Sequence, residues 1–464
     1  MRKKILFTGR VAVFTLLFIF VLAGCGDAEK VLESISVTDK PKKIMYLLGD
    51  SFDPEGMVVT ANYSDGSSKK IIDYTISGFT SDKPGKKLIT VSYESKTDSF
   101  NVSVSDPFRN ISAAELVEDV KIGWNLGNTL DAHRAEWVGS DISVADMETG
   151  WFRPITTKEN ITALKNAGFN AIRIPVTWYK AADAEYNIRS DWMARVKEVV
   201  NYAIDNEMYV FLNTHHDEDI FKFMNSTAEE SKKAFKKIWG QIADAFKDYN
   251  ERLVFEALNE PRTKSSSMEW NGGTPEEHAN LNAHYQIFVD TVRASGGNNN
   301  RRIIMVNTYA ASSTDRAVNA LVIPDDTIED RIIVSIHAYE PYNFALNEST
   351  GYVTTWSKNT PSDTSNIINL LNRARNKFID NGFPVIMGES GAMRRNITDE
   401  NELAAHEVTR AEWAEFYVGS ARERGIKFFW WDDGGNFRLF NRGDNTFYYP
   451  LIYAGLMRGA GVIE

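Results

Sequence analysis

Eight short apolar segments follow one another after residue 107, and this regular spacing constrains the fold more than any other feature. Each segment has the length of a buried strand, and most of the stretches between them show the 3.6-residue period of a helix. Strands that alternate with helices form parallel β/α units, and eight such units predict a (β/α)8 TIM barrel. The predicted strands are Lys121–Leu126, Ala171–Val176, Tyr209–His215, Leu253–Asn259, Ile303–Thr308, Ile332–Tyr339, Pro384–Glu389 and Lys427–Trp431.

The predicted helices lie between these strands. Gly168, Gly382 and Gly425 come just before strands, where a glycine commonly follows the last turn of a helix. The helix near Asp315–Leu321 is short, so the fifth unit is the weakest. The longer predicted helices are Met193–Asp205, Glu230–Tyr249, Glu277–Ala294, Ser365–Asn381 and Arg410–Arg424.

Residues 31–105 have a different pattern. Short strand-like segments alternate with turn signals, and no stretch keeps a helical period. We expect a small all-β sandwich of about seven strands. The clearest strands are Ser34–Val37, Met57–Tyr63, Lys86–Tyr93 and Ser99–Val104. The composition changes at Asp106-Pro107, so the barrel is predicted to occupy residues 108–464.

The N-terminus has the pattern of an export signal. Basic residues 2–4 precede an apolar run, Val11–Leu22, which has the length of a signal core and is short for a membrane span. Leu22-Ala23-Gly24-Cys25 resembles a bacterial lipobox, so we expect a signal peptide over 1–24, a lipidated Cys25 and a tether over 25–30. Cys25 is the only cysteine, which excludes an intramolecular disulfide.

Polar and aromatic residues stand at the predicted strand ends, where a parallel barrel assembles its active site. Leu253–Pro261 runs into Asn259 and Glu260 before a proline stops the strand. Pro384–Ala392 delivers Glu389 in the same manner. Alone, the first stretch would suit a capping Asn and a solvated Glu, but a second carboxylate favours a site. The other strand-end residues are Arg173, His215, His216, His337, Tyr339, Trp430 and Trp431.

This set of residues suits cleavage of a glycosidic bond. One carboxyl group protonates the leaving oxygen, and the other attacks or stabilises the oxocarbenium-like carbon. An aromatic share of 12%, with eleven Trp, suits flat sugar faces. A formal net charge of −11 argues against nucleic acid as a partner.

Several positions leave alternatives open. Only one of Trp430 and Trp431 faces the site if the strand is regular, and the same holds for His215 and His216, of which we place His215 inside. Glu256 lies about 13 Å deeper on a regular strand and is predicted to be structural. Asp432 and Asp433 either touch substrate or are solvated. The two histidines lack a third ligand with zinc-site spacing, so no metal is expected.

Seven motifs, in order, resemble glycoside hydrolase family 5, and most of all its subfamily 4 of endo-β-glucanases and xyloglucanases. They are IGWNLGNTLDA (122–132), GFNAIRIPVTW (168–178), NTHHD (213–217), FEALNEP (255–261), SIHAYEPY (335–342), MGESGA (387–392) and FWWDDG (429–434). The resemblance runs from about Phe108 to Glu464 and implies a (β/α)8 barrel with retaining chemistry. Two phrases in the first domain, GDSFDPEGMVVTANYSDGS and YTISGFTSDKPGKKLITVSY, resemble a bacterial Ig-like domain.

The resemblance also implies roles for single residues. Glu260 matches the acid/base and Glu389 the nucleophile, which Arg173 and Tyr339 hold ionised and in position. The remaining matches and candidates contact or support the sugar: Asn259 at the 2-hydroxyl, His215, His216 and His337 beside the reacting sugar, Trp431 beneath it, and Asn125 in the first motif. Two ionised carboxylates as close as retaining chemistry requires would repel each other, so one pKa should rise. Because Arg173 stabilises the charged form of Glu389, we expect the raised pKa to be that of Glu260. Three tryptophans in later loops, Trp137, Trp270 and Trp356, either stack on further sugars or pack internally.

These observations predict an exported, lipid-anchored, retaining endo-β-1,4-glucanase that acts on cellulose, mixed-linkage glucan or xyloglucan. We expect a monomer without a cofactor, at the cell surface or on the periplasmic face of a membrane, with a β-glucan as its partner. Mannanase or xylanase activity on the same catalytic residues is the alternative within the enzyme class. A non-catalytic glycan-binding lipoprotein is the alternative outside it, although a binder would not need both carboxylates.

Overall fold

The computed structural model describes residues 30–83, 85–105, 107–133 and 138–464. The described residues form two compact units. One contains residues 30–42, 54–78 and 88–100, and the other contains the described parts of 43–53, 79–87 and 101–464. Cys25 and Trp137 lie outside the described residues.

The described residues before 106 contain seven strands in two sheets, as the sequence predicts. The first sheet is antiparallel, in the order β1 (Leu32–Asp39), β3 (Val58–Tyr63), β4 (Ser68–Ile71). The second has the order β2 (Met45–Leu47), β7 (Lys96–Ser105), β6 (Gly85–Tyr93), β5 (Thr75–Ser77). Alternating burial along β3 places Val59 and Ala61 inside, as expected of a strand with one covered face.

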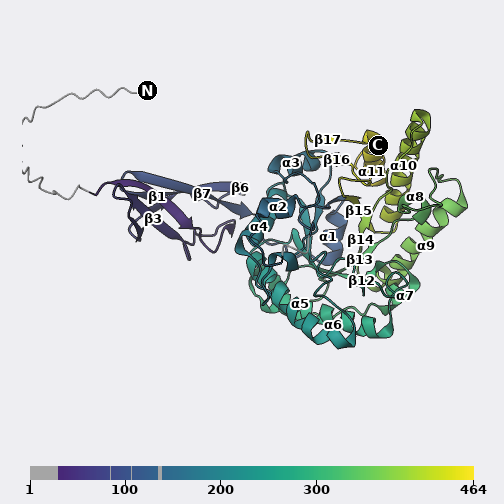
Figure 1. The fold of residues 1–464 in the computed structure, drawn as a ribbon, viewed down its shortest axis with the longest axis horizontal. Coiled ribbons are helices and arrows are strands. Elements are labelled where there is room, and N and C mark those ends of the chain that lie inside the picture. Colours follow the sequence, from purple (N-terminus) through teal and green to yellow (C-terminus); the bar gives the residue numbers. More distant parts are fainter. Residues whose placement is uncertain (1–29, 84, 106, 134–137) are drawn as a thin grey trace, which may run out of the picture. The chain divides into compact units, whose positions relative to one another are not determined.

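The next eight strands form a closed parallel barrel in sequence order, which confirms the predicted fold (Figure 1). They are β8 (Gly123–Leu126), β9 (Ala171–Ile174), β10 (Tyr209–Asn213), β11 (Leu253–Glu256), β12 (Ile304–Ser312), β13 (Ile332–His337), β14 (Val385–Ser390) and β15 (Lys427–Asp432). Their residues are almost all buried on both faces, because side chains fill the interior and helices cover the outside.

Helices surround these strands (Figure 1). The longer ones are α3 (Lys158–Asn166), α4 (Ser190–Ile204), α5 (Asn225–Phe246), α6 (Pro275–Ala294), α9 (Pro361–Lys377), α10 (Glu400–Arg422) and α11 (Pro450–Gly459). The short ones are α2 (Val144–Glu148), α7 (Asp315–Ala320) and α8 (Tyr342–Ala345), and β16 (Phe440–Asn441) pairs with β17 (Thr446–Phe447). Thr157 and Thr274 form capping boxes with Asn160 and Glu277, which fixes where α3 and α6 begin.

One further helix, α1 (Ala113–Asp119), closes the N-terminal end of the barrel. Leu116 and Val117 are buried in one apolar cluster with residues from inside the barrel, among them Phe211 and Phe429. The rings of Phe211 and Phe429 meet edge to face at 5.1 Å. Gly123 makes room for this packing, because a Cβ there would overlap the ring of Phe429. This end of the barrel is therefore filled with apolar side chains.

The predicted strand Leu253–Asn259 is too long by three residues, because β11 ends at Glu256. After the N–H of Ala257 donates to the carbonyl of Met305, the chain leaves the sheet. The side-chain amide of Asn307 donates to both Glu256 Oε1 and the carbonyl of Asn259, each at 2.9 Å. Glu256 consequently lies directly below the mouth of the barrel, and the depth of about 13 Å expected for a regular strand does not apply.

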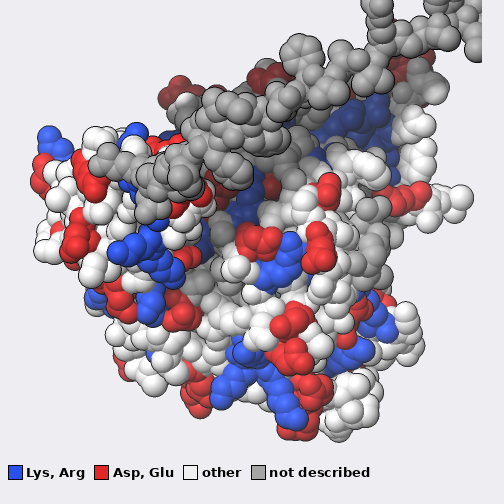
Figure 2. Space-filling view, turned by 60° about the vertical axis from the view of Figure 1, so that its left-hand side comes forward, with Lys and Arg blue, Asp and Glu red and all other residues white. Residues whose placement is uncertain are grey.

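Acidic and basic side chains lie next to one another on the face shown in Figure 2. Among the described residues, no helix is long and apolar enough to cross a membrane.

Candidate active site

A cavity of about 430 Å³ opens where the barrel strands end. Residues from six different strand ends or the loops after them line it, including both predicted carboxylates. The predicted site residues in its wall are His215, His216, Asn259, Glu260, His337, Tyr339, Glu389 and Trp431. The structure thus brings together eight of the residues selected from the sequence.

Arg173 organises the floor of this cavity. It is fully buried, and all five of its N–H donors have an acceptor. Nε and Nη2 donate to Glu256 at 2.6 and 3.2 Å, and Nη1 donates to Glu389 at 2.6 Å and to Asn125 at 3.1 Å. Nη2 also donates to Asn259 Oδ1 at 2.8 Å. Glu256 is therefore the counter-ion of Arg173 beneath the site, as predicted for a structural residue.

Asn125 lies below the cavity wall. It is fully buried, and its side-chain amide donates to the carbonyls of Gly388 and Trp430 at 2.9 and 3.1 Å. Its Oδ1 accepts from Arg173, so it links β8 to β14 and β15. Asn125 thereby supports the guanidinium of Arg173, and it is not among the residues that line the cavity.

Glu389 is held on both carboxylate oxygens. Oε1 accepts from Arg173, and Oε2 accepts from the Tyr339 hydroxyl at 3.1 Å. Burial, and then the negative charges of Glu389 and Glu260, raise the pKa of Tyr339 well above its usual range, so its hydroxyl remains a donor. The Nδ1 of His337 is 3.7 Å from Oε2. These contacts leave the carboxylate oriented and facing the cavity.

Glu260 contacts a different pair of side chains, His337 and Arg262. Its Oε1 is hydrogen-bonded to Nδ1 of His337 at 3.1 Å, and its Oε2 lies 3.5 Å from Nη1 of Arg262. Burial acts to raise the pKa of Glu260, but the hydrogen bond and charge of His337 and the charge of Arg262 outweigh it, and the pKa is lowered. The expected rise in the pKa of Glu260 is therefore wrong for this structure, because the sequence argument did not include the contacts of Glu260 with His337 and Arg262.

The two carboxylates lie close together: one oxygen of Glu260 and one of Glu389 are within 4.8 Å of each other. Retaining glycosidases hold their carboxyl groups about 5–5.5 Å apart, whereas inverting ones leave about 6.5–9.5 Å for a water. The separation here fits the shorter class.

An aromatic wall lies on one side of the carboxylates. The rings of His215 and Trp431 are parallel within 1°, with centroids 5.7 Å apart. Trp431 lines the cavity, whereas Trp430 is fully buried and donates from its indole to the carbonyl of Phe437 at 2.9 Å. The question of which tryptophan faces the site is therefore answered in favour of Trp431.

The two histidines do not diverge as strand neighbours would, because β10 ends at Asn213, before either of them. Their rings meet edge to face at 4.5 Å, and both line the cavity. Burial and nearby positive charges lower the pKa of His215 far below its usual range, so it is neutral. The pKa of His216 is raised: burial opposes this, but Glu218, 3.6 Å from its Nδ1, outweighs it.

Two groups of side chains have a spacing that a metal ion would also accept. Ligand atoms of Asp131, His215 and His216 lie within 4.8 Å of one another, as do those of Glu260, His337 and Glu389. In the first group, both oxygens of Asp131 already accept backbone N–H bonds from Asn128 and Thr129, and in the second, both glutamates have cationic or hydroxyl partners. Hydrogen bonding accounts for these contacts.

Trp356, a candidate either for contact with substrate or for internal packing, does not lie in the cavity wall. Its side chain is buried, packs against Phe416 with ring centroids 5.3 Å apart, and donates to the carbonyl of Asp363 at 2.9 Å. The packing role is therefore the correct one. Trp270, in contrast, lines the cavity and is 58% exposed.

The two acids after the last strand are structural. Asp432 is buried and accepts from the Trp124 indole at 3.0 Å and from the backbone N–H groups of Leu439 and Phe440. Asp433 accepts from the N–H groups of Gly435 and Phe437. Both carboxylates therefore shape the loop that follows Trp431.

Sequence reasoning missed three residues near the site: Arg262, Glu218 and Phe437. Phe437 lines the cavity and packs on Tyr339 at 5.4 Å. Arg262 comes two residues after Glu260, and that proximity was the available signal. Glu218 follows the NTHHD motif, but nothing in its own sequence context marks it.

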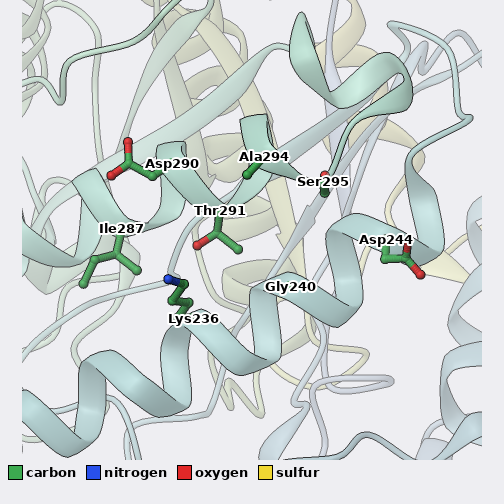
Figure 3. Close-up of a pocket in the computed structure, with 8 residues that line it drawn as sticks. All are labelled: Lys236, Gly240, Asp244, Ile287, Asp290, Thr291, Ala294 and Ser295. Carbon is green, nitrogen blue, oxygen red and sulfur yellow. The ribbon is translucent and has the colours of Figure 1, made fainter.

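A second cavity, of about 480 Å³, lies between α5 and α6, outside the barrel (Figure 3). Gly240 on α5 faces Thr291 on α6 there, and no aromatic ring is among the residues drawn. The chemistry described above belongs to the cavity at the strand ends.

Two protein families match this chain. The family described as "Cellulase (glycosyl hydrolase family 5)" matches residues 135–436, and "Bacterial Ig-like domain (group 3)" matches residues 39–104. The second match agrees with the predicted Ig-like resemblance.

Among curated proteins, the chain is 43% identical over 372 residues to "Cellulase/esterase CelE" of Acetivibrio thermocellus, with 78% of this chain and 42% of that protein aligned. It is 40% identical over 357 residues to "Endoglucanase A" of Clostridium longisporum, with 75% of this chain and 66% of that protein aligned. The chain thus spans less than two thirds of either relative.

Among solved structures, a "GH5-4 broad specificity endoglucanase" of Ruminococcus champanellensis, with bound cellotriose, superposes with a TM-score of 0.70 at 41% identity. The alignment covers 75% of this chain and 99% of that one. Almost all of that chain is therefore matched by three quarters of this one.

Proposed function

We propose that this chain, which belongs to glycoside hydrolase family 5, is a retaining endo-β-1,4-glucanase. The observation that carries the proposal is the pair Glu260 and Glu389, whose nearest oxygens are within 4.8 Å, with a separate set of hydrogen-bond partners for each. Two carboxylates in different environments provide the acid and the nucleophile that the reaction needs.

In the first step Glu389 attacks the anomeric carbon while Glu260 transfers a proton to the glycosidic oxygen, whose bond to that carbon breaks. The attack forms a glycosyl ester and releases the leaving chain as an alcohol. Arg173 and Tyr339 hold the attacking carboxylate. The lowered pKa of Glu260 confines its acid form, and with it this proton transfer, to acidic pH, and His337 Nδ1 holds Oε1 of that carboxyl group at 3.1 Å.

In the second step Glu260 acts as a base. It removes a proton from water, the water oxygen attacks the anomeric carbon, and the ester bond to Glu389 breaks. A lowered pKa suits this step, because the carboxylate is the form required. Two displacements at one carbon return the original anomeric configuration.

The substrate class follows from the cavity and the relatives. Trp431 and the exposed Trp270 both line the cavity and offer flat apolar faces for sugar rings. Endoglucanase relatives and a neighbour with bound cellotriose favour β-1,4-linked glucose. Cellulose, mixed-linkage glucan and xyloglucan are the proposed polymers, and mannan or xylan are the alternatives.

Release of reducing ends from a panel of soluble cellulose derivative, mixed-linkage glucan, xyloglucan, mannan and xylan tests this proposal. We expect a rapid fall in viscosity with the glucans, and β-configured product when the anomeric proton is followed by NMR as cleavage begins. Binding without cleavage of any polymer would make the chain a glycan-binding protein, and α-configured initial product would exclude double displacement.

We further propose that the chain is an exported lipoprotein with a signal peptide over 1–24, a lipidated Cys25, a tether over 25–30, an Ig-like domain over 31–105 and a catalytic domain over 108–464. Support comes from the apolar run that ends at Leu22-Ala23-Gly24-Cys25. Stable anchoring takes two or more acyl chains. Cys25→Ala should move the protein from the membrane pellet to the soluble fraction, and unchanged sedimentation would contradict lipidation.

A further inference from the structure

Arg262 connects the carboxylate of Glu260 to the exposed ring of Trp270. Its Nη1 donates to the carbonyl of Glu260 at 2.8 Å, and its guanidinium lies over the ring of Trp270 at 4.4 Å. Nε donates to Glu269 Oε1 at 3.1 Å. The side chain is only 10% exposed, so these contacts hold it in one place beside the cavity.

The charge of Arg262 is divided between two carboxylates. Nη1 is 3.5 Å from Oε2 of Glu260 and 3.5 Å from Oε1 of Glu218. Glu218 remains charged at neutral pH, because its pKa is lowered to about 2: burial opposes this, but His216 and Lys264 outweigh it. Arg262 thus lies between two carboxylates without a short hydrogen bond to either of them. Arg173 differs, because it donates a short hydrogen bond to each of its two carboxylates.

The charged and titratable groups around Glu260 come from several strand ends. His337 follows β13 and contacts Oε1, and Glu389 on β14 faces it within 4.8 Å. Tyr339 lies beyond His337, and His216 adds a weaker positive influence from the end of β10. Arg262 is the group at Oε2, so its charge acts on the oxygen that His337 does not reach.

We infer that Arg262 is a positioning residue that fixes Oε2 of Glu260 and sets the pH above which this carboxyl group no longer delivers a proton to the leaving oxygen. The inference rests on the proposed function, in which Glu260 is the acid of the first step. Removing the positive charge disfavours the carboxylate, so the pKa of Glu260 rises and the acid form survives to higher pH.

The test is the pH dependence of kcat/KM, which reports the free enzyme. Two neutral variants, Arg262→Gln and Arg262→Met, should move the alkaline limb upward by about one pH unit on mixed-linkage glucan. Arg262→Lys keeps the charge and should leave the limb within a few tenths of a unit. Lys264→Gln is the matched control: Lys264 contacts Glu218 at 3.3 Å and has no ion pair with Glu260 among the described residues, so its loss should move the limb less.

A second substrate separates this role from a structural one. 2,4-Dinitrophenyl β-cellobioside has a leaving group that departs without a proton, so the alkaline limb of its kcat/KM should be the same in every variant. The inference would be overturned if the variants lost kcat/KM equally on both substrates while the alkaline limb of the pH profile on glucan stayed in place. Failure of both neutral variants to fold would overturn it as well. If the unmodified enzyme cleaves neither substrate, the proposed function itself is wrong, which is a different result from an unmoved limb.

Discussion

The two ends of the barrel are built from the same eight strands and have opposite properties. At the N-terminal end, α1 and the rings of Phe211 and Phe429 form a hydrocarbon plug. At the C-terminal end, four charged side chains, Arg173, Glu256, Glu260 and Glu389, lie in or beside one cavity. The comparison teaches that this barrel separates the packing that holds it together from the groups that carry out chemistry.

The barrel sheet is also less regular toward its C-terminal end. Register shifts occur between β12 and β13, between β13 and β14, and between β14 and β15, and each lies toward the C-terminal ends of the strands. These irregularities direct His337 and Glu389 into the cavity, which is a known use of bulges beside active sites. The pairs β9–β10 and β10–β11 have no such shift.

The largest expected effect comes from the C-terminal end. Glu389→Ala should lower turnover of glucan by about 10⁴-fold or more, because it removes the proposed nucleophile. The fold should survive, since Glu256 still balances the charge of Arg173. With an activated aryl cellobioside, azide should fill the vacated position and give an α-glycosyl azide, identified by NMR.

Glu260→Ala is the matched variant for that experiment. There the ester to Glu389 still forms, so azide should attack it and give a β-glycosyl azide. If the two variants gave the opposite products, the roles of Glu260 and Glu389 would be exchanged. A large loss of thermal stability in Glu389→Ala would show that the C-terminal end also contributes to stability.

A mutation at the N-terminal end should show the reverse pattern. Phe429→Ala removes a fully buried ring from the plug, which should cost about 3–5 kcal/mol of unfolding free energy. Urea titration followed by tryptophan fluorescence measures that loss. The variant's kcat at a temperature where it is folded should stay within about twofold of the unmodified enzyme, and a kcat loss comparable to that of Glu389→Ala would show that the ends are coupled.

The smallest effect is expected from shortening the chain. A protein that starts at Phe108 keeps α1 and should retain its kcat on soluble glucan, because the plug and the cavity lie within 108–464. A protein that starts at Ile122 lacks α1 and should be the less stable of the two in urea. Equal stability of the two would show that α1 adds nothing, and an insoluble first protein would refute a separate catalytic domain.

The sequence predicted the barrel well because its strands are buried on both faces and appear as continuous apolar runs. Glu260 and Glu389 were found because each follows such a run. The contact between Glu260 and His337 could not be predicted, since His337 is 77 residues away and its ring position depends on a register shift. The role of Trp356 could not be decided from the sequence, because a tryptophan in a loop has the same sequence context whether it packs on Phe416 or on a sugar.

The five hydrogen bonds of Arg173 have a consequence for how activity appears during folding. They join residues separated by 48, 83, 86 and 216 positions in the chain, and contacts of such long range are expected to form late. A chain in which β14 has not yet docked has no fixed nucleophile, however complete its helices are. Recovery of glucanase activity after dilution from denaturant should therefore lag behind recovery of the helical circular dichroism signal, which makes catalysis a reporter of barrel closure.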